Sequence, residues 1–221
     1  PAAAIIRSAA IGDEDPQLQR ARELGWVDFK YAEMLGRLAP RGRTLAVAGT
    51  HGKTTSTWML HHALRAIADA SPGAPSPGVL VGGIDATLKT NAVVPDAGGW
   101  FGVEACEYDR SFLQLDPRGA IITNVEADHL DIYGDLQGVR EGFRTFLRGM
   151  RNGGRVVACA DDLGSAALLS GAGASGYSYG TSAGSMLRAV DVSVTSMSTR
   201  CRVVEDGVAV GELTLSIGGV H

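Results

Sequence analysis

One short stretch of the chain, LAVAGTHGKTTST (residues 45–57), limits the possible folds more than any other. It begins as an apolar run, passes through two glycines that enclose a threonine and a histidine, and ends in a lysine followed by hydroxyl residues. Residues 52–70 then have the length and the apolar spacing of a helix. A buried strand that turns into a helix through a glycine-rich loop predicts an α/β fold.

The loop between this strand and helix has the composition of a phosphate-binding turn. Its backbone N–H groups would point to one place, and the helix dipole adds roughly half a positive charge there. Lys53 adds a full charge, and Thr54 offers a hydroxyl to a metal ion. The pattern GxxxxGK[ST] would need glycine where Val47 stands, but the shorter GxxGK[ST] fits residues 49–54. We therefore predict a site for a triphosphate with Mg²⁺; the alternative is a tight turn with a surface lysine.

The rest of the chain alternates short apolar strands with helical patterns. Further strands are expected in residues 3–11, 78–83, 100–106, 119–125 and 154–162, and helices in residues 16–25, 28–40 and 135–150. The strands are apolar on both faces, which predicts a mainly parallel sheet flanked by helices, as in P-loop NTPases. Residues 186–217 instead alternate apolar and polar side chains around an EDG turn, which indicates a small antiparallel β appendage near the C-terminus.

Two segments with acidic or histidine side chains follow strands of this predicted sheet. Glu104 stands near the C-terminal end of one strand, and TNVEADHLD (residues 123–131) lies just beyond another. Since the C-terminal ends of parallel strands share an edge with the phosphate loop, Glu104 and His129 could converge on the phosphates. Glu104 would hold Mg²⁺, which prefers oxygen ligands, and His129 would act through a second ion. The alternatives are an ion-paired acid and a solvated histidine, and Asp128 and Asp131 are interpreted as helix-cap or loop acids.

Composition and charge exclude several classes of function. The formal net charge is -4 and the chain has no basic run, so it lacks the electrostatic footprint of a nucleic-acid-binding protein. No apolar stretch approaches the roughly 20 residues that span a bilayer, and the N-terminus does not have the pattern of a signal peptide. The three cysteines form no CxxC pair, which predicts reduced thiols and a cytoplasmic location.

Together these segments resemble the Mur ligase family, the ATP-dependent amide-bond-forming enzymes of peptidoglycan synthesis. AGTHGKTT (residues 48–55) is similar to the family's phosphate loop, and its histidine is typical of the alanine-adding branch. EACEYDRSFLQLDPRGAIITNVEADHLDIYGD (residues 104–135) resembles the same branch, and GRVVACADD fits the strand that follows. RSAAIGDEDPQL and YAEMLGRL are similar to the last part of that branch's N-terminal UDP-binding domain and its link into the central one.

The resemblance implies a role for each candidate site residue. Lys53 and His129 would be catalytic, with Lys53 on the β- and γ-phosphates of ATP and His129 at a second metal site between the γ-phosphate and the substrate carboxylate. Thr54 and Glu104 would hold one Mg²⁺ ion, and Asn124 would line the nucleotide or substrate side. The residues implied to wrap the phosphates are Gly49, Thr50, His51, Gly52, Lys53, Thr54 and Thr55.

The resemblance also implies domains and substrates. Residues 1–40 would be the end of an N-terminal UDP-binding domain with its linker, and residues 41–221 a central ATP-binding domain, with the chain ending before a C-terminal domain. The full enzyme would join the lactyl carboxylate of UDP-N-acetylmuramate to L-alanine through an acyl phosphate, and this fragment alone is expected to be inactive. Cys106 departs from the branch, which usually has aspartate there. No lysine follows Lys89, so the carbamylated lysine of other branches is impossible here.

Other functions stay open at the level of sequence. A recycling ligase that joins UDP-N-acetylmuramate to a whole tripeptide shares the phosphate loop, and its block can read EYD, as residues 107–109 do. A non-catalytic nucleotide-binding module would need the phosphate loop but neither Glu104 nor His129, and a bare structural domain would bind no ATP. The stretch EADHLDIYGD (residues 126–135) favours the alanine-adding ligase.

Overall fold

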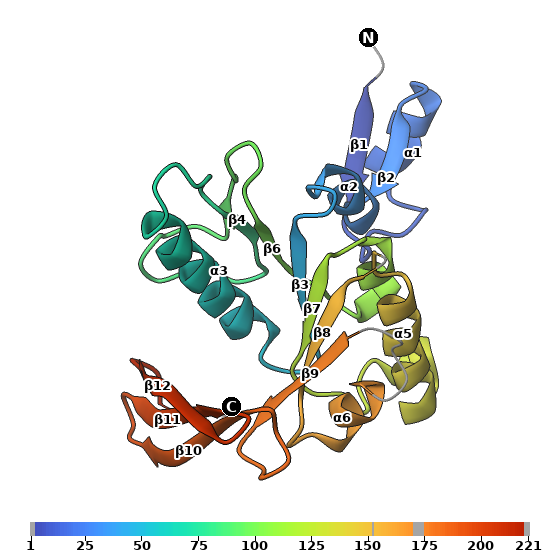
Figure 1. Ribbon diagram of the computed structural model, residues 1–221. Coiled ribbons are helices and arrows are strands. Elements are labelled where there is room, and N and C mark those ends of the chain that lie inside the picture. Colours follow the sequence, from blue (N-terminus) through green and yellow to red (C-terminus); the bar gives the residue numbers. More distant parts are fainter. Residues whose placement is uncertain (1–2, 152, 170–174, 219–221) are drawn as a thin grey trace.

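The computed structural model describes residues 3–151, 153–169 and 175–218, and its main feature is one ten-stranded sheet with flanking helices (Figure 1). The strands of this sheet are β3 (Thr44–Ala48), β4 (Gly78–Leu80), β5 (Ala92–Val93), β6 (Phe101–Glu104), β7 (Gly119–Ile122), β8 (Arg155–Cys159), β9 (Ser175–Gly180), β10 (Leu187–Val194), β11 (Thr199–Glu205) and β12 (Val208–Leu215). The helices beside it are α3 (Lys53–Asp69), the 3₁₀ segment η1 (Tyr108–Gln114), α4 (Leu130–Tyr133), α5 (Leu136–Arg148) and α6 (Leu163–Leu169).

The strand order β12-β11-β10-β9-β8-β7-β3-β6-β4-β5 confirms the predicted mainly parallel sheet. The six strands from β9 to β4 pair in parallel, and β5 is an antiparallel edge strand. β10, β11 and β12 form the predicted antiparallel segment, with its turn at Asp206 and Gly207. This segment continues the main sheet, because β10 pairs in parallel with β9 through Leu187↔Tyr179 and Arg188↔Gly180.

Helices cover both faces of the parallel part of the sheet (Figure 1). α3 lies on one face, where buried Trp58 packs with Val79 and Val81. α5 and α6 lie on the other, and α5 turns its apolar stripe into the main core. Phe143 of α5 is fully buried against the ring of Phe112 in η1, a burial that contributes about 1.5–3 kcal/mol. No helix in the described part of the chain is both long and apolar enough to cross a membrane.

Residues 3–38 form a small two-stranded unit beside the main sheet. β1 (Ala4–Arg7) and β2 (Val27–Lys30) make a parallel two-stranded sheet, and α1 (Pro16–Glu23) and α2 (Tyr31–Leu38) accompany it. The prediction of one helix over residues 28–40 is wrong at its start, because residues 27–30 pair with β1 as a strand. The helix begins only at Tyr31, where the Glu33 carboxylate accepts a hydrogen bond from the Lys30 N–H at 2.8 Å and fixes the first turn.

The strand order decides which loops meet. β3 lies at the centre, with β6 on one side and β7 on the other. The chain leaves all three parallel strands at the same edge of the sheet, so the segments after β3, β6 and β7 become neighbours there. These are the segments that carry the phosphate loop, Glu104 and His129.

Candidate functional site

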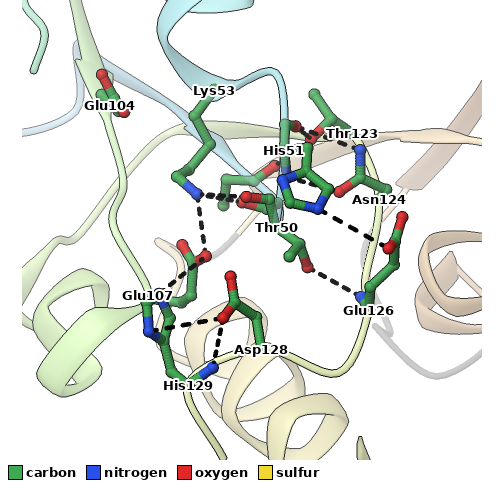
Figure 2. Close-up of polar contacts among 12 residues, drawn as sticks. Thr50, His51, Lys53, Glu104, Glu107, Thr123, Asn124, Glu126, Asp128 and His129 are labelled. Carbon is green, nitrogen blue, oxygen red and sulfur yellow. Dashed lines mark hydrogen bonds and ion pairs between the residues drawn. The ribbon is translucent and has the colours of Figure 1, made fainter. Parts of the chain in front are cut away.

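The phosphate loop, residues 49–52, connects β3 to the N-terminus of α3 (Figure 2). Gly49 (φ 144°) and Gly52 (φ 79°) have backbone conformations that side-chain-bearing residues rarely adopt. The segment after β7 forms two hydrogen bonds with the loop. The Thr50 N–H donates to the Asn124 carbonyl at 3.0 Å, and the Glu126 N–H donates to the Thr50 hydroxyl at 2.9 Å. The loop is therefore held in shape before any ligand arrives.

Replacing Gly49 with alanine should destabilise the fold more than replacing Gly52 with alanine. A Cβ at position 49 would lie 1.9 Å from the Thr123 hydroxyl, whereas one at position 52 meets nothing within 4 Å. Both variants thus lose roughly 1–3 kcal/mol of stability through backbone strain, and only Gly49→Ala adds a steric clash. Thermal unfolding followed by circular dichroism measures the difference, and an equal loss in the two variants would contradict it.

Asn124 holds the loop with its side chain as well. Its Oδ1 accepts from the His51 N–H at 2.8 Å and its Nδ2 donates to the His51 carbonyl at 3.2 Å. The Thr123 hydroxyl donates to the same carbonyl at 2.7 Å. Asn124 thus positions the loop in this structure, and its predicted contact with nucleotide or substrate stays a prediction. The His51 ring is exposed, with Nε2 3.9 Å from Glu126, and Thr55 is exposed in the first turn of α3.

Lys53 uses its ammonium group on three acceptors. Its Nζ donates to the Gly49 carbonyl at 2.6 Å, to the Thr50 carbonyl at 3.0 Å and to Glu107 Oε1 at 2.9 Å. Those three bonds account for the three protons of an ammonium group. Lys53 is therefore folded back against its own loop, and it must give up at least one of these bonds to reach a phosphate.

Glu104 and Thr54 meet at the start of α3. The Thr54 hydroxyl donates to Glu104 at 3.0 and 3.1 Å, and the Gly82 N–H donates to Glu104 Oε2 at 2.8 Å. A hydroxyl and a carboxylate side by side are the hard oxygen donors that Mg²⁺ takes together with substrate phosphates. The two residues predicted as ligands of one ion thus lie together and have suitable chemistry.

His129 lies on the Glu107 side of Lys53 (Figure 2). Its Nε2 is 3.9 Å from Glu107 Oε1 and its Nδ1 is 3.8 Å from Asp128 Oδ1. Ligand atoms of Glu107, Asp128 and His129 all lie within 4.8 Å of one another, close enough to suit a metal ion. The predicted residue is thus accompanied by two carboxylates, one of which, Asp128, the sequence presents as a loop acid.

Glu107 is the residue that sequence reasoning missed. Its side chain is only 3% exposed, although polar residues 108–111 follow it directly. The turn that follows is unusual, because Asp109 (φ 51°) and Arg110 (φ 55°) both have left-handed backbones, as His129 does (φ 50°). Such strain in side-chain-bearing residues gathers at functional sites. The one available signal was spacing: a second acid three positions after Glu104.

Comparison with known proteins gives the context for this site. Residues 47–221 match the Mur ligase middle domain. The chain is 38% identical over 220 residues to the UDP-N-acetylmuramate–L-alanine ligase of Salinispora arenicola, which covers 98% of this chain and 42% of that protein. It is 38% identical over 217 residues to the enzyme of the same name from Rubrobacter xylanophilus, with 98% and 46% covered. The chain thus spans less than half the length of these relatives.

Solved structures agree with the sequence matches. The UDP-N-acetylmuramate–alanine ligase of Thermotoga maritima superimposes with a TM-score of 0.79 at 27% identity, over 99% of this chain and 47% of that one. A ligase for UDP-N-acetylmuramate and L-alanyl-γ-D-glutamyl-meso-diaminopimelate from Neisseria has a TM-score of 0.78 at 24% identity, over 97% and 68%, and shows the same fold. Because the matched domain covers far more than half of its residues, this chain belongs to the Mur ligase family.

Proposed function

We propose that the complete gene product containing this chain is an ATP-dependent ligase that joins the carboxylate of UDP-N-acetylmuramate to L-alanine in peptidoglycan synthesis. The observation that carries the proposal is the meeting, at one sheet edge, of a nucleotide-type loop with Lys53, a Thr54–Glu104 pair and a His129 cluster. The names of the relatives supply the substrates. Three free thiols agree with a cytoplasmic location.

The chemistry asks little covalent work of the protein. A carboxylate is a poor acylating agent at neutral pH, and transfer of a phosphoryl group from ATP converts it to an acyl phosphate that an amine can attack. Loop N–H groups and Lys53 would bind the phosphates, and their positive charge would lower the barrier to transfer. Thr54 and Glu104 would hold Mg²⁺, which neutralises phosphate charge when it is bound. His129 would hold a second cation on the side of the acid substrate.

A cavity beside Glu104 supports a place for the acid substrate. It has a volume of about 320 Å³ and lies between the small N-terminal unit and the main sheet. Its lining includes the cations Arg7 and Lys30 together with Tyr31, Cys106 and Tyr108. We propose that residues 1–40 end a UDP-binding domain and that residues 41–221 are the ATP-binding domain, which agrees with the match beginning at residue 47.

The test is a competition between amine substrates. The complete gene product would be given ATP, Mg²⁺ and UDP-N-acetylmuramate with either L-alanine or the L-alanyl-γ-D-glutamyl-meso-diaminopimelate tripeptide, and ADP release and product mass would be recorded. We expect turnover with L-alanine. Turnover with the tripeptide alone would assign the recycling ligase instead, and ATP binding without turnover of either amine would assign a nucleotide-binding module.

A further inference from the structure

The Glu107 carboxylate is a buried charge with incomplete bonding. Its side chain is only 3% exposed. Of its two oxygens, Oε1 has a close cationic partner, Lys53 Nζ at 2.9 Å. Oε2 is buried and has no hydrogen-bond partner among the described residues. A buried carboxylate oxygen without a partner is costly, so its retention points to a partner that joins it at some stage.

The surroundings of Glu107 indicate what that partner is. His129 Nε2 lies 3.9 Å from Glu107 Oε1, and Asp128 stands next to His129, so two carboxylates and one imidazole face a common point. Their ligand atoms span at most 4.8 Å. Opposite ligands of an ion with metal–oxygen distances of about 2.1 Å lie about 4.2 Å apart, so only small rotations would close the set. A divalent cation fits this donor set.

Lys53 competes for the same carboxylate. Its side chain is 13% exposed, and its ammonium group bonds to Glu107 and brings a full positive charge next to the point that a second cation would occupy. Two cations sharing one carboxylate in a poorly solvated site repel each other strongly. The structure shows Glu107 paired with Lys53, and a divalent cation on the same carboxylate would require Lys53 to move away.

We infer that Glu107 is a shared counter-ion that Lys53 holds in the nucleotide-free chain and releases to a divalent cation on Asp128 and His129 when phosphates draw Lys53 away. Glu107 is thus a positioning residue whose partner depends on the occupancy of the phosphate loop. Because binding linkage is reciprocal, the cation also frees Lys53 and favours nucleotide binding. The inference rests on the proposed function for the purpose of the cation, but its binding can be measured without any reaction.

The experiment removes the competitor instead of adding nucleotide. Binding of Mn²⁺ alone to the complete gene product would be followed by electron paramagnetic resonance and calorimetry, without nucleotide. Lys53→Met removes the ammonium charge. If that variant folds poorly, Lys53→Gln is used instead, because glutamine also lacks the charge but can still form hydrogen bonds. We expect the Lys53 variants to bind one Mn²⁺ at least about tenfold more tightly than the unaltered protein does. Circular dichroism would confirm that each variant is folded.

Second substitutions assign the ligands. In the Lys53→Met or Lys53→Gln background, Glu107→Gln and His129→Ala should each abolish the tighter binding, whereas Glu104→Gln should leave it in place. The inference is overturned if removing Lys53 does not tighten Mn²⁺ binding, if tight binding survives Glu107→Gln, or if Glu104→Gln removes it. The Mn²⁺ measurement does not depend on ligase activity. A protein without ligase activity would contradict the proposed function but would leave this inference to be judged by Mn²⁺ binding.

Discussion

Lys53→Met is expected to weaken ATP binding by about 100-fold, because a charge-assisted bond to phosphate contributes about 1.5–3 kcal/mol. The same change should lower stability by about 3–5 kcal/mol, since it leaves Glu107, 3% exposed, without its ion-pair partner. Calorimetric titration with ATP and Mg²⁺ measures the first effect, and thermal unfolding measures the second. A matched control is Lys89→Met, which alters an exposed lysine and should change neither quantity.

Adding Glu107→Gln separates the two effects of Lys53. The double variant Lys53→Met/Glu107→Gln has no buried unpaired charge, so it should recover most of the lost stability while ATP binding stays weak. A double variant as unstable as the single one would show that the ion pair is not the source of the stability loss. Full ATP affinity in Lys53→Met would contradict the role of Lys53 at the phosphates.

Glu104→Gln is expected to reduce ligase turnover by about 100- to 1000-fold, the range seen when one preorganised electrostatic contact is lost at a transition state. Glutamine keeps an oxygen that can accept from Thr54 and from the Gly82 N–H, so the fold should survive. The loss arises because a neutral amide is a much weaker Mg²⁺ ligand than a carboxylate. Steady-state rates of the complete gene product over a range of Mg²⁺ concentrations measure it.

Glu126→Gln is the matched control for Glu104→Gln. Glu126 is an exposed acid at the same sheet edge, 3.9 Å from the His51 ring. It belongs neither to the Thr54–Glu104 pair nor to the group of possible metal ligands around His129. Its replacement should leave turnover within about twofold, as expected for a surface substitution. Equal losses in the two variants would mean that general acidity of this edge, and not a metal ligand at Glu104, sets the rate.

The parts of the fold and site that the sequence predicted are those with a local cause. One continuous stretch of sequence contains the apolar run of β3, the glycines of the loop and the helical period of α3. The strand, the turn and the helix can therefore be predicted from neighbouring residues alone. The meeting of Glu104 with Thr54 followed from one rule, that parallel strands end at one edge. No local pattern was needed beyond a carboxylate at the end of β6.

The parts that escaped prediction depend on distant residues. Residues 27–30 become a strand because β1, more than twenty positions earlier, offers a backbone to pair with. Glu107 is buried and paired with Lys53, which lies 54 positions earlier in the chain, and it stands next to a left-handed turn at Asp109 and Arg110 that no local sequence pattern predicts. β9 and α6 were not expected either, since short elements carry weak periodicity.

The Lys30–Asp109 ion pair ties the small N-terminal unit to the turn beside Glu107, at 2.6 Å. Its side chains are 40% and 35% exposed, so solvent and salt screen the attraction and the pair contributes at most about 1 kcal/mol. Raising ionic strength should weaken this ion pair, whereas the apolar contact that Leu35 of α2 makes with the main core does not depend on salt. Packing of α2, and not this ion pair, therefore sets most of the attachment of the unit to the sheet, so the attachment should persist at high salt.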